Sequence, residues 1–217
     1  MCYDNQKTNG RDSMFRALFG QDGLLNSLFN HISDALLLSL LWLLFCLPVV
    51  TIGPSTTAMY AVAVKVFRRG EKGTCRKFWQ AFKSNLRRGL PLSLIWLTFF
   101  ASVAYCMIFL WNAIEKEMVG ASAFFVACVF VFLLIGIQGI LFPMVSRFEN
   151  TVGKLLVNTV VMAIGNLPRT LMVGLLVVLG IALCLWQGWL VILVPGVVTV
   201  ACTYFIEPIF APYMSEE

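Results

Sequence analysis

Long apolar runs, separated by short polar segments, dominate the chain. A helix that crosses a hydrocarbon core of about 30 Å needs about 20 apolar residues, with a working range of about 17 to 25. The clearest runs of this kind lie at residues 35–52, 90–111, 118–142, 170–186 and 189–206. The pattern therefore predicts an all-α, polytopic helical membrane protein in which these runs are transmembrane helices.

A further stretch, residues 54–69, is short and carries Lys65. Short cytoplasmic loops are enriched in Lys and Arg, and residues 68–88 hold eight such cations against one acid, Glu71. If this basic loop and the N-terminus are both cytoplasmic, only residues 54–69 can bring the chain back. We therefore predict about six spans in the cell membrane, with both termini cytoplasmic. The alternative is a re-entrant hairpin at 48–60 and five spans.

The chain divides into three parts on this pattern. Residues 1–23 are polar, without a cleavable signal, and are predicted to be a cytoplasmic N-terminal segment. Residues 24–212 form a single integral membrane domain, and residues 213–217 a short C-terminal tail. Two amphipathic stretches, 74–88 and 151–166, are predicted as cytoplasmic interfacial helices.

The first apolar run stops at an unusual cluster of turn-forming residues. A proline interrupts the helix because it has no N–H to donate, whereas a second proline suits the first turn of the next helix. We predict a turn between the first two spans, or alternatively irregular backbone that lines a cavity at membrane depth. The residues of this motif are Pro48, Thr51, Gly53, Pro54, Thr57 and Tyr60.

Residues 74–88 place aromatic side chains on one helical face and cations mostly around the other. This arrangement favours contact with an anionic inner leaflet over binding of nucleic acid, for which no recognition motif is present. The residues predicted to contact lipid or a docking partner from the inner loops are Arg76, Lys77, Trp79, Lys83, Asn85, Arg87, Arg88, Arg147, Asn166 and Arg169.

The two inner loops also resemble one another. A shift of 81 residues aligns Phe67 with Phe148, Asn85 with Asn166, Leu86 with Leu167 and Arg88 with Arg169. Each copy reads as an inward span, an interfacial helix and an outward span. The match favours an internal repeat in parallel orientation, which occurs in transporters but does not by itself indicate transport.

Composition agrees with the membrane class and offers little chemistry. Hydrophobic residues make up 59% of the 217 residues and charged residues 12%, with a mean hydropathy of +0.85; a soluble domain carries about 25% charged residues. The seven cysteines are scattered without metal-ligand or disulfide spacing. No catalytic motif occurs, so we predict no catalytic residue, no metal site and no cofactor.

The remaining polar candidates are few. A polar stripe near the start of the first span contains Asn26, Asn30, His31 and Asp34. His31 and Asp34 are one turn apart, and together with Glu207 they are the only seed for a membrane enzyme, which we consider the weakest alternative. Gln138 and Glu207 are further polar candidates, one within a span and one at a span boundary, where helix packing is the ordinary role of such residues.

The stretch LPVVTIGPSTTAMY, residues 47–60, resembles the YesL family of bacterial membrane proteins, a domain of unknown function common in Gram-positive bacteria. Stretches at 78–89 and 142–168 also resemble the family's basic loop and its Arg-Phe-acid-Asn and Asn-Leu-Pro run. Ser39 departs from the pattern, because relatives often carry Asn there.

The resemblance implies a multi-span inner-membrane protein without a known catalytic residue. It also implies an accessory or assembly role beside carbohydrate uptake of the ABC type, with importer subunits as partners. Two alternatives stay open, a small solute transporter or permease that acts on its own, and a membrane enzyme.

Overall fold

The computed structural model describes residues 24–116 and 120–214, and within them the chain is helical without strands. The predictions for residues 1–23 and for the end of the C-terminal tail lie outside the described residues. The α-helices are α2 (Leu24–Cys46), α3 (Ile52–Ala63), α4 (Thr74–Glu115), α5 (Ala121–Arg147), α6 (Val152–Gly165), α7 (Leu167–Trp186) and α8 (Val194–Phe210).

Short helical turns of other kinds join these elements. They are the 3₁₀ turns η1 (Val49–Thr51), η3 (Gly188–Ile192) and η4 (Ala211–Tyr213), and the π-helical turn η2 (Val64–Arg68) that continues α3. The prediction of an all-α polytopic membrane fold is confirmed.

Five helical segments are long and apolar enough to cross a membrane: Val49–Arg68, Thr74–Glu115, Ser122–Arg147, Leu167–Trp186 and Val194–Tyr213. The first of them contains all of the doubtful stretch 54–69 except its last residue, Arg69. The apolar part of α2, Asn30–Cys46, is shorter than these, so the crossing by this helix stays a prediction.

The first predicted run, 35–52, does not form one helix. α2 ends at Cys46, and Val49–Thr51 form the separate turn η1 before α3 begins at Ile52. The residue before a proline is disfavoured in the helical conformation, and the Leu47–Pro48 pair lies at this boundary. Pro48 is extended, with φ −75° and ψ 111°.

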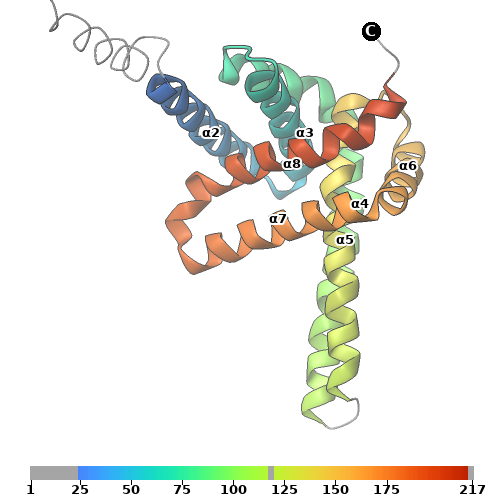
Figure 1. Ribbon diagram of the computed structural model, residues 1–217. Helices are drawn as coiled ribbons and strands as arrows, with labels where there is room; N and C mark the ends of the chain where they lie inside the picture. The colour runs from blue at the N-terminus through green and yellow to red at the C-terminus, as the bar shows by residue number, and fades with distance from the viewer. Residues whose placement is uncertain (1–23, 117–119, 215–217) are drawn as a thin grey trace, which may run out of the picture.

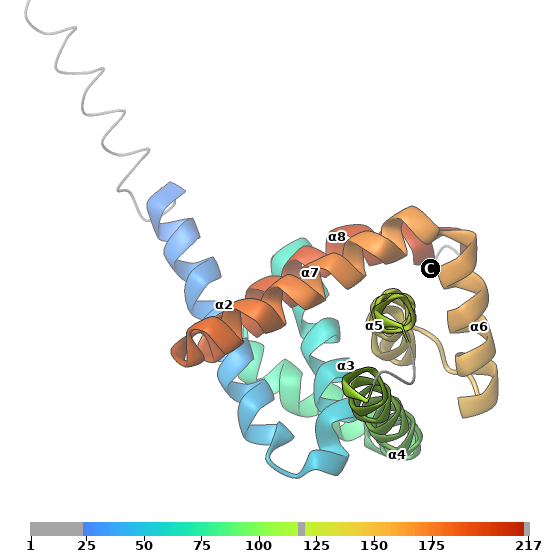
Figure 2. The ribbon, with the colours of Figure 1, turned by 90° about the horizontal axis from the view of Figure 1, so that it is seen from below.

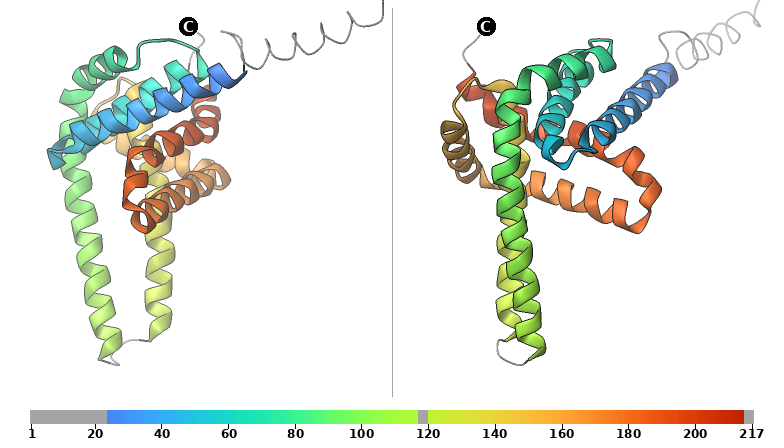
Figure 3. Two further views of the ribbon diagram at one scale, coloured as in Figure 1. Left: turned by 90° about the vertical axis from the view of Figure 1, so that its left-hand side faces the viewer. Right: turned by 180° about the vertical axis from the view of Figure 1, so that it is seen from behind.

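Conversely, two predicted elements join into one. The interfacial helix 74–88 and the span 90–111 lie in the continuous 42-residue helix α4. Figure 3 shows that α4 nevertheless changes direction: its first part runs across one end of the molecule and the remainder runs down beside α5. Pro91 lies within this helix, and a proline removes a helical hydrogen bond and commonly causes a kink.

The helices do not form a parallel bundle. α4 and α5 make an antiparallel pair whose hairpin end projects beyond the other helices, whereas α7 and α8 run across α5 (Figures 1 and 2). Large apolar side chains on the projecting part are exposed, for example Tyr105 at 72% and Phe125 at 71%. Such surface suits lipid contact.

Two buried clusters hold the opposite end together. In one, Leu38 of α2, Met59 of α3 and Phe78 of α4 pack together. The other joins α5 to α8 through residues such as Phe142 and Ile206. The aromatic face of the basic segment 74–88 is thus partly covered by protein rather than by lipid alone.

Small residues allow close crossings at equivalent positions of the two predicted repeats. In α4, Gly89 and Ser93 lie against Gly53 and Pro54 of α3. In α7, Thr170 and Gly174, each 81 residues further on, lie against Gly136 of α5; the Gly136 Cα is 3.2 Å from the position of a Cβ added to Gly174. Small residues let helix backbones approach closely, and this shared contact pattern supports the internal repeat.

Candidate functional site

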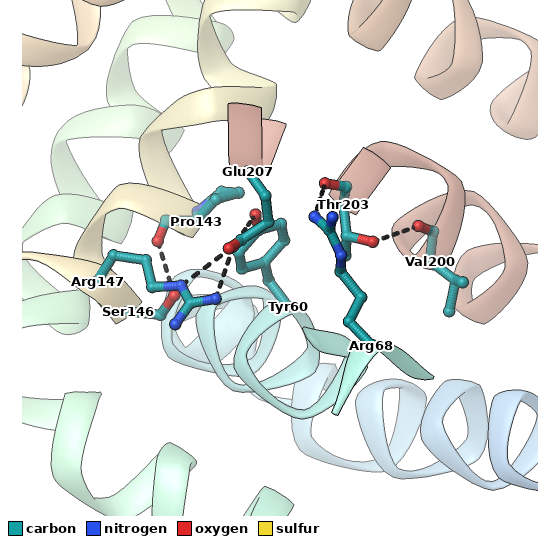
Figure 4. Close-up of polar contacts among 8 residues, drawn as sticks. All are labelled: Tyr60, Arg68, Pro143, Ser146, Arg147, Val200, Thr203 and Glu207. Carbon is teal, nitrogen blue, oxygen red and sulfur yellow. Dashed lines mark hydrogen bonds and ion pairs between the residues drawn. The ribbon is translucent and has the colours of Figure 1, made fainter. Parts of the chain in front are cut away.

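Three helices meet at a polar cluster formed by Tyr60 of α3, Arg147 of α5 and Glu207 of α8 (Figure 4). The Tyr60 hydroxyl donates to Glu207 Oε1 at 2.8 Å. Arg147 donates to the same oxygen from Nε at 3.1 Å and from Nη2 at 2.7 Å. The Arg147 and Glu207 side chains are only 16% and 14% exposed, so these charge-assisted hydrogen bonds are largely shielded from water.

Local sequence places each partner. Arg147 is the last residue of α5, where a cation complements the negative end of the helix dipole. Glu207 immediately precedes Pro208 in α8. Tyr60 lies less than two turns after Pro54, which is in the first turn of α3, and both residues are buried.

A second arginine reaches α8 from the π-helical turn at the end of α3. Arg68 donates from Nη1 to the Thr203 carbonyl oxygen at 3.1 Å, and its guanidinium lies 5.5 Å from the centre of the Tyr204 ring. In this turn the Arg69 N–H bonds to the Val64 carbonyl, five residues back. π-turns of this kind occur often at functional sites.

Arg169, at the start of α7, adds a third arginine contact by donating to the Pro208 carbonyl at 3.2 Å. The last carbonyls of a helix lack helical partners and carry partial negative charge. Arginines from three different helical segments therefore converge on the C-terminal half of α8.

Beside this cluster lies a cavity of about 660 Å³, bordered by side chains of α2, α3, α4, α5, α7 and α8. Its lining is mostly apolar. Tyr60 borders it, so the polar cluster lies at the cavity wall. Gln138 of α5 and the indoles of Trp42 and Trp96 also line it.

Two serines fix the helix starts around this cavity. Ser93 of α4 accepts a hydrogen bond from the Gly53 N–H of α3 at 3.0 Å. Ser39 of α2 accepts one from the Gly196 N–H of α8 at 2.8 Å. Each serine satisfies an N–H of a helix N-terminus that has no helical partner. Ser39, the departure from the family pattern, is therefore a buried inter-helix contact.

The predicted turn motif is a helix–break–helix turn. The Thr51 hydroxyl bonds to the Phe45 carbonyl at 2.6 Å and closes the turn. Gly53 and Pro54 are buried in the contact with α4, whereas Pro48 is exposed.

The alternative, that this region lines a cavity, holds for the side chains of α3. Ile52, Thr56 and Tyr60 border the cavity. Thr57 does not, and its buried hydroxyl has no partner within the described part of the chain. In this region the cavity is thus lined by regular helix rather than by irregular backbone.

The polar stripe on α2 does not form a shared site. His31 stacks on Phe67 with ring centres 5.5 Å apart, and Asp34 accepts a hydrogen bond from the Thr74 hydroxyl at 2.7 Å. Asn30 is exposed, and the side chain of Asn26 lies outside the described residues. Glu207 is paired with Tyr60 and Arg147 instead, so the predicted seed for an enzyme is divided between two places.

The residues predicted to contact lipid or a partner separate into several roles. Arg147 and Arg169 contact α8, as described above. Arg88 pairs with Glu149 at 3.5 Å, which joins α4 to the loop before α6. Asn85 within α4 and Asn166 directly after α6 each bond to the carbonyl four residues back. The exposed members are Arg76, Trp79, Lys83, Arg87 and Arg169.

Lys77 is held by a neighbouring acid. Its Nζ lies 2.7 Å from Glu71 Oε2. The hydrogen bond from the Lys77 ammonium lowers the pKa of the Glu71 carboxyl below its usual value of 4.5. Lys77 therefore stabilises the loop before α4 rather than presenting a free charge to lipid.

The side chains of the polar cluster bond to one another. Tyr60 and Arg147 both donate to one oxygen of Glu207, so the carboxylate is balanced by a cation. Across residues 24–116 and 120–214, no three His, Cys, Asp or Glu side chains gather in a way that could hold a metal ion. The arrangement suits a tie between helices at the cavity wall.

Sequence reasoning named Tyr60, Arg147 and Glu207 separately but did not bring them together, and it missed Arg68 and Thr203. One signal was available. An acid within a membrane span usually pairs with a cation inside the protein. That rule pointed to an arginine at a span end, but not to which one.

Comparison with known proteins identifies a family for part of the chain. Residues 35–113 match the family described as a protein of unknown function, DUF624, which is the YesL family. The resemblance is therefore confirmed over this region. No curated protein and no solved structure matches the chain.

Proposed function

Starting from a membrane protein whose residues 35–113 match a family of unknown function, we propose that the chain is a non-enzymatic accessory or assembly factor for carbohydrate uptake of the ABC type. We place it in the cell membrane, with both termini in the cytoplasm. The observation that carries this proposal is the exposed surface of the two inner-loop segments, which lie at the same end of the molecule (Figure 3).

The first segment, residues 74–88, has one face that packs against the protein and one face that is exposed. Phe78 and Phe82 anchor it against α2 and α3, while Arg76, Lys83 and Arg87 stay exposed. A cationic face of this kind suits an anionic leaflet or an acidic surface on a partner.

The second segment, α6, exposes apolar side chains instead. Val157, Val161 and Ile164 are 63%, 61% and 60% exposed, one or two turns apart on the helix. Leu155 and Met162 are buried on the other side. A row of apolar residues at this spacing is the pattern by which a helix packs against a partner helix.

A non-enzymatic role agrees with the polar chemistry described above. The buried acid is paired, and the polar stripe is occupied by local contacts. Partner binding needs none of these groups as a nucleophile or a base.

The proposal is tested by affinity purification from native membranes in mild detergent. We expect co-purification of ABC importer subunits for carbohydrates. The double variant Val157→Ser/Val161→Ser should lose them, whereas the control Leu175→Ser/Leu179→Ser, on an exposed face of α7, should retain them. Absence of importer subunits from the wild-type preparation, or equal recovery with both double variants, would count against docking through α6.

A small transporter that acts alone is the second candidate, and the cavity is the observation that favours it. Its apolar lining suits a sugar poorly, because a sugar needs several polar groups to replace water. Purified protein in proteoliposomes separates the two functions. Flux of any sugar without other proteins would replace the accessory role with transport.

The membrane orientation has its own test. Reporters inserted after residue 70 and between residues 117 and 119 should report opposite sides of the membrane, with residue 70 on the cytoplasmic side. A reporter after residue 70 that reads outside would overturn the topology.

A further inference from the structure

The cavity beside Tyr60 has no part in the accessory role proposed above, and its lining indicates what kind of molecule would fit it. We propose that it binds one hydrocarbon chain of a membrane amphiphile, with a neutral oxygen-bearing linkage of that molecule held by Gln138. This inference is independent of the accessory role above.

The walls of the cavity specify an apolar body. Val177, Val198 and Ile206 are among the lining side chains from α7 and α8. A volume of about 660 Å³ lies within the usual range of about 300–1,000 Å³ for small-molecule sites. Apolar surface of this extent favours a hydrocarbon chain over a sugar or an ion.

The rim of the cavity indicates where the ligand enters. Ile181 and Leu185 border the cavity and are 50% and 81% exposed. Both belong to α7, a helix long and apolar enough to span the membrane. An opening between such side chains faces hydrocarbon, so the ligand reaches the cavity from within the bilayer.

Gln138 supplies the polar specificity. The other side-chain hydroxyls at the wall are already used: Thr56 donates to the Ile52 carbonyl, Thr199 to the Pro195 carbonyl and Tyr60 to Glu207. Within the described part of the chain, no such bond engages the Gln138 amide. An amide in an apolar wall is costly without a partner, and it can both donate to and accept from an ester or hydroxyl.

The charged cluster limits the site at one wall. The Glu207 carboxylate is compensated by Arg147. Because the charges are balanced there, a charged headgroup gains little beside Tyr60. This favours a neutral linkage at Gln138 over an anionic group bound by arginine.

The test uses full-length protein in detergent that retains only Trp42 and Trp96, the two tryptophans that line the cavity. The other four, Trp79, Trp111, Trp186 and Trp189, are exposed and are replaced by Phe. The probe is a monoglyceride with a bromine-labelled stearoyl chain, because bromine quenches tryptophan fluorescence at short range. We expect quenching that saturates with increasing probe.

Matched variants define the site. Cys184→Phe fills the cavity and should weaken saturable quenching at least about ten-fold, whereas the control Leu183→Phe, one residue away and outside the lining, should leave it unchanged. Gln138→Leu should weaken monoglyceride binding about five-fold, as expected for one hydrogen bond. The same variant should bind a brominated alkane, which has no oxygen, as well as wild type does.

A second measurement covers the case in which Cys184→Phe fails to fold. In protein with Cys184 as its only cysteine, the monoglyceride should slow maleimide labelling of that thiol at least about ten-fold. Quenching that rises without saturation and equally in every variant, or labelling that the probe does not slow, would overturn the site. Equal monoglyceride affinity of Gln138→Leu and wild type would overturn the role of Gln138.

Discussion

Residues 74–88 and α6 begin from the same sequence plan and present opposite surfaces. Each follows a long apolar helix and a phenylalanine, Phe67 or Phe148. Asn85 within the first segment and Asn166 directly after α6 each bond to the carbonyl four residues back. The first segment buries aromatic residues and exposes cations. The second buries a narrow face and exposes valine and isoleucine.

The two copies also differ in continuity. The first segment continues without a break into the part of α4 that runs beside α5, whereas α6 ends at Gly165 and α7 begins at Leu167. Pro168 lies in the first turn of α7, and the equivalent position in the first copy is Arg87. Pro168 has no N–H to donate to the carbonyl of Ile164 four residues back, so the helical hydrogen bonding of α6 does not continue through it. We therefore expect Pro168 to help separate α6 from α7, whereas Arg87 allows the helix to continue.

The largest expected effect comes from removing Glu207, whose hydrogen bond and ion pair link the two predicted repeats. Tyr60 belongs to the first, Arg147 to the second, and Glu207 joins both. Glu207→Leu leaves Arg147 unpaired in a mostly buried site, which should lower the free energy of unfolding by about 4 kcal/mol. Denaturation in detergent measures it. The double variant Arg147→Met/Glu207→Leu should recover part of the loss, and a single-variant loss below about 1 kcal/mol would contradict the role of the tie.

The next largest loss of stability is expected from a change that interrupts the continuous helix α4. Arg87→Pro places a proline in the interior of α4, where it removes a hydrogen bond and clashes with the preceding turn, and should cost about 3 kcal/mol. Thermal unfolding of purified protein measures this loss.

The converse change, Pro168→Ala, serves as its control. It should cost less than about 1 kcal/mol, and it should lengthen the distance between spin labels at Val157 and Leu179 as α6 and α7 straighten. An unchanged distance would mean that packing rather than Pro168 separates the two helices.

Alanine substitutions at the two close helix crossings should lower stability by similar amounts. Gly53→Ala meets the Ser93 hydroxyl and the Phe142 ring, and Gly136→Ala meets the Thr170 carbonyl oxygen at 2.9 Å. Each should cost about 2 kcal/mol through overpacking. Gly153→Ala has no neighbour within 4 Å and should stabilise by about 0.5 kcal/mol. Tolerance of Gly136→Ala but not of Gly53→Ala in unfolding measurements would show that the crossings are not equivalent.

A smaller effect is expected on the preference for anionic lipid, to which only the cationic surface should contribute. Lys83→Gln/Arg87→Gln should weaken enrichment of anionic lipid by about 1 kcal/mol per charge, and less at high salt. Spin-labelled anionic and neutral lipids in nanodiscs measure this preference. Val157→Gln/Val161→Gln in α6 should leave it unchanged, and an equal loss in both double variants would remove the proposed division of roles.

The smallest effect is a pH dependence at the start of the first segment. Lys77 holds the pKa of Glu71 below 4.5, so the pair stabilises the fold above that pH and the contribution disappears as the pH falls through the lowered pKa. The stability difference between wild type and Lys77→Gln should therefore shrink below about pH 4.5. A difference that stays constant down to about pH 3 would show that Glu71 is not the group concerned.

Much of the fold could be predicted because it depends on local pattern. Apolar run length predicted the helical segments, and the boundary of α6 at 152–165 lies close to the expected 151–166. The end of α2 was placed too late, since apolar residues continue past Pro48 while the helix does not. The union of 74–88 with 90–111 was missed, because Gly89 and Pro91 look like a break but only bend the helix.

The candidate site was less accessible to such reasoning. Its partners lie 60 to 147 residues apart along the chain. No local pattern links Tyr60 with Glu207, and the same is true of the bond from Gly196 to Ser39.

By itself, the sequence determined that the chain is helical and apolar, where its cations gather, and that two stretches share one plan, since each of these follows from neighbouring residues. Tertiary structure decided that α7 and α8 cross α5, that three arginines meet α8, and that a cavity opens beside Gln138. Those outcomes depend on which small residues let backbones approach, and that is settled only when distant helices pack together.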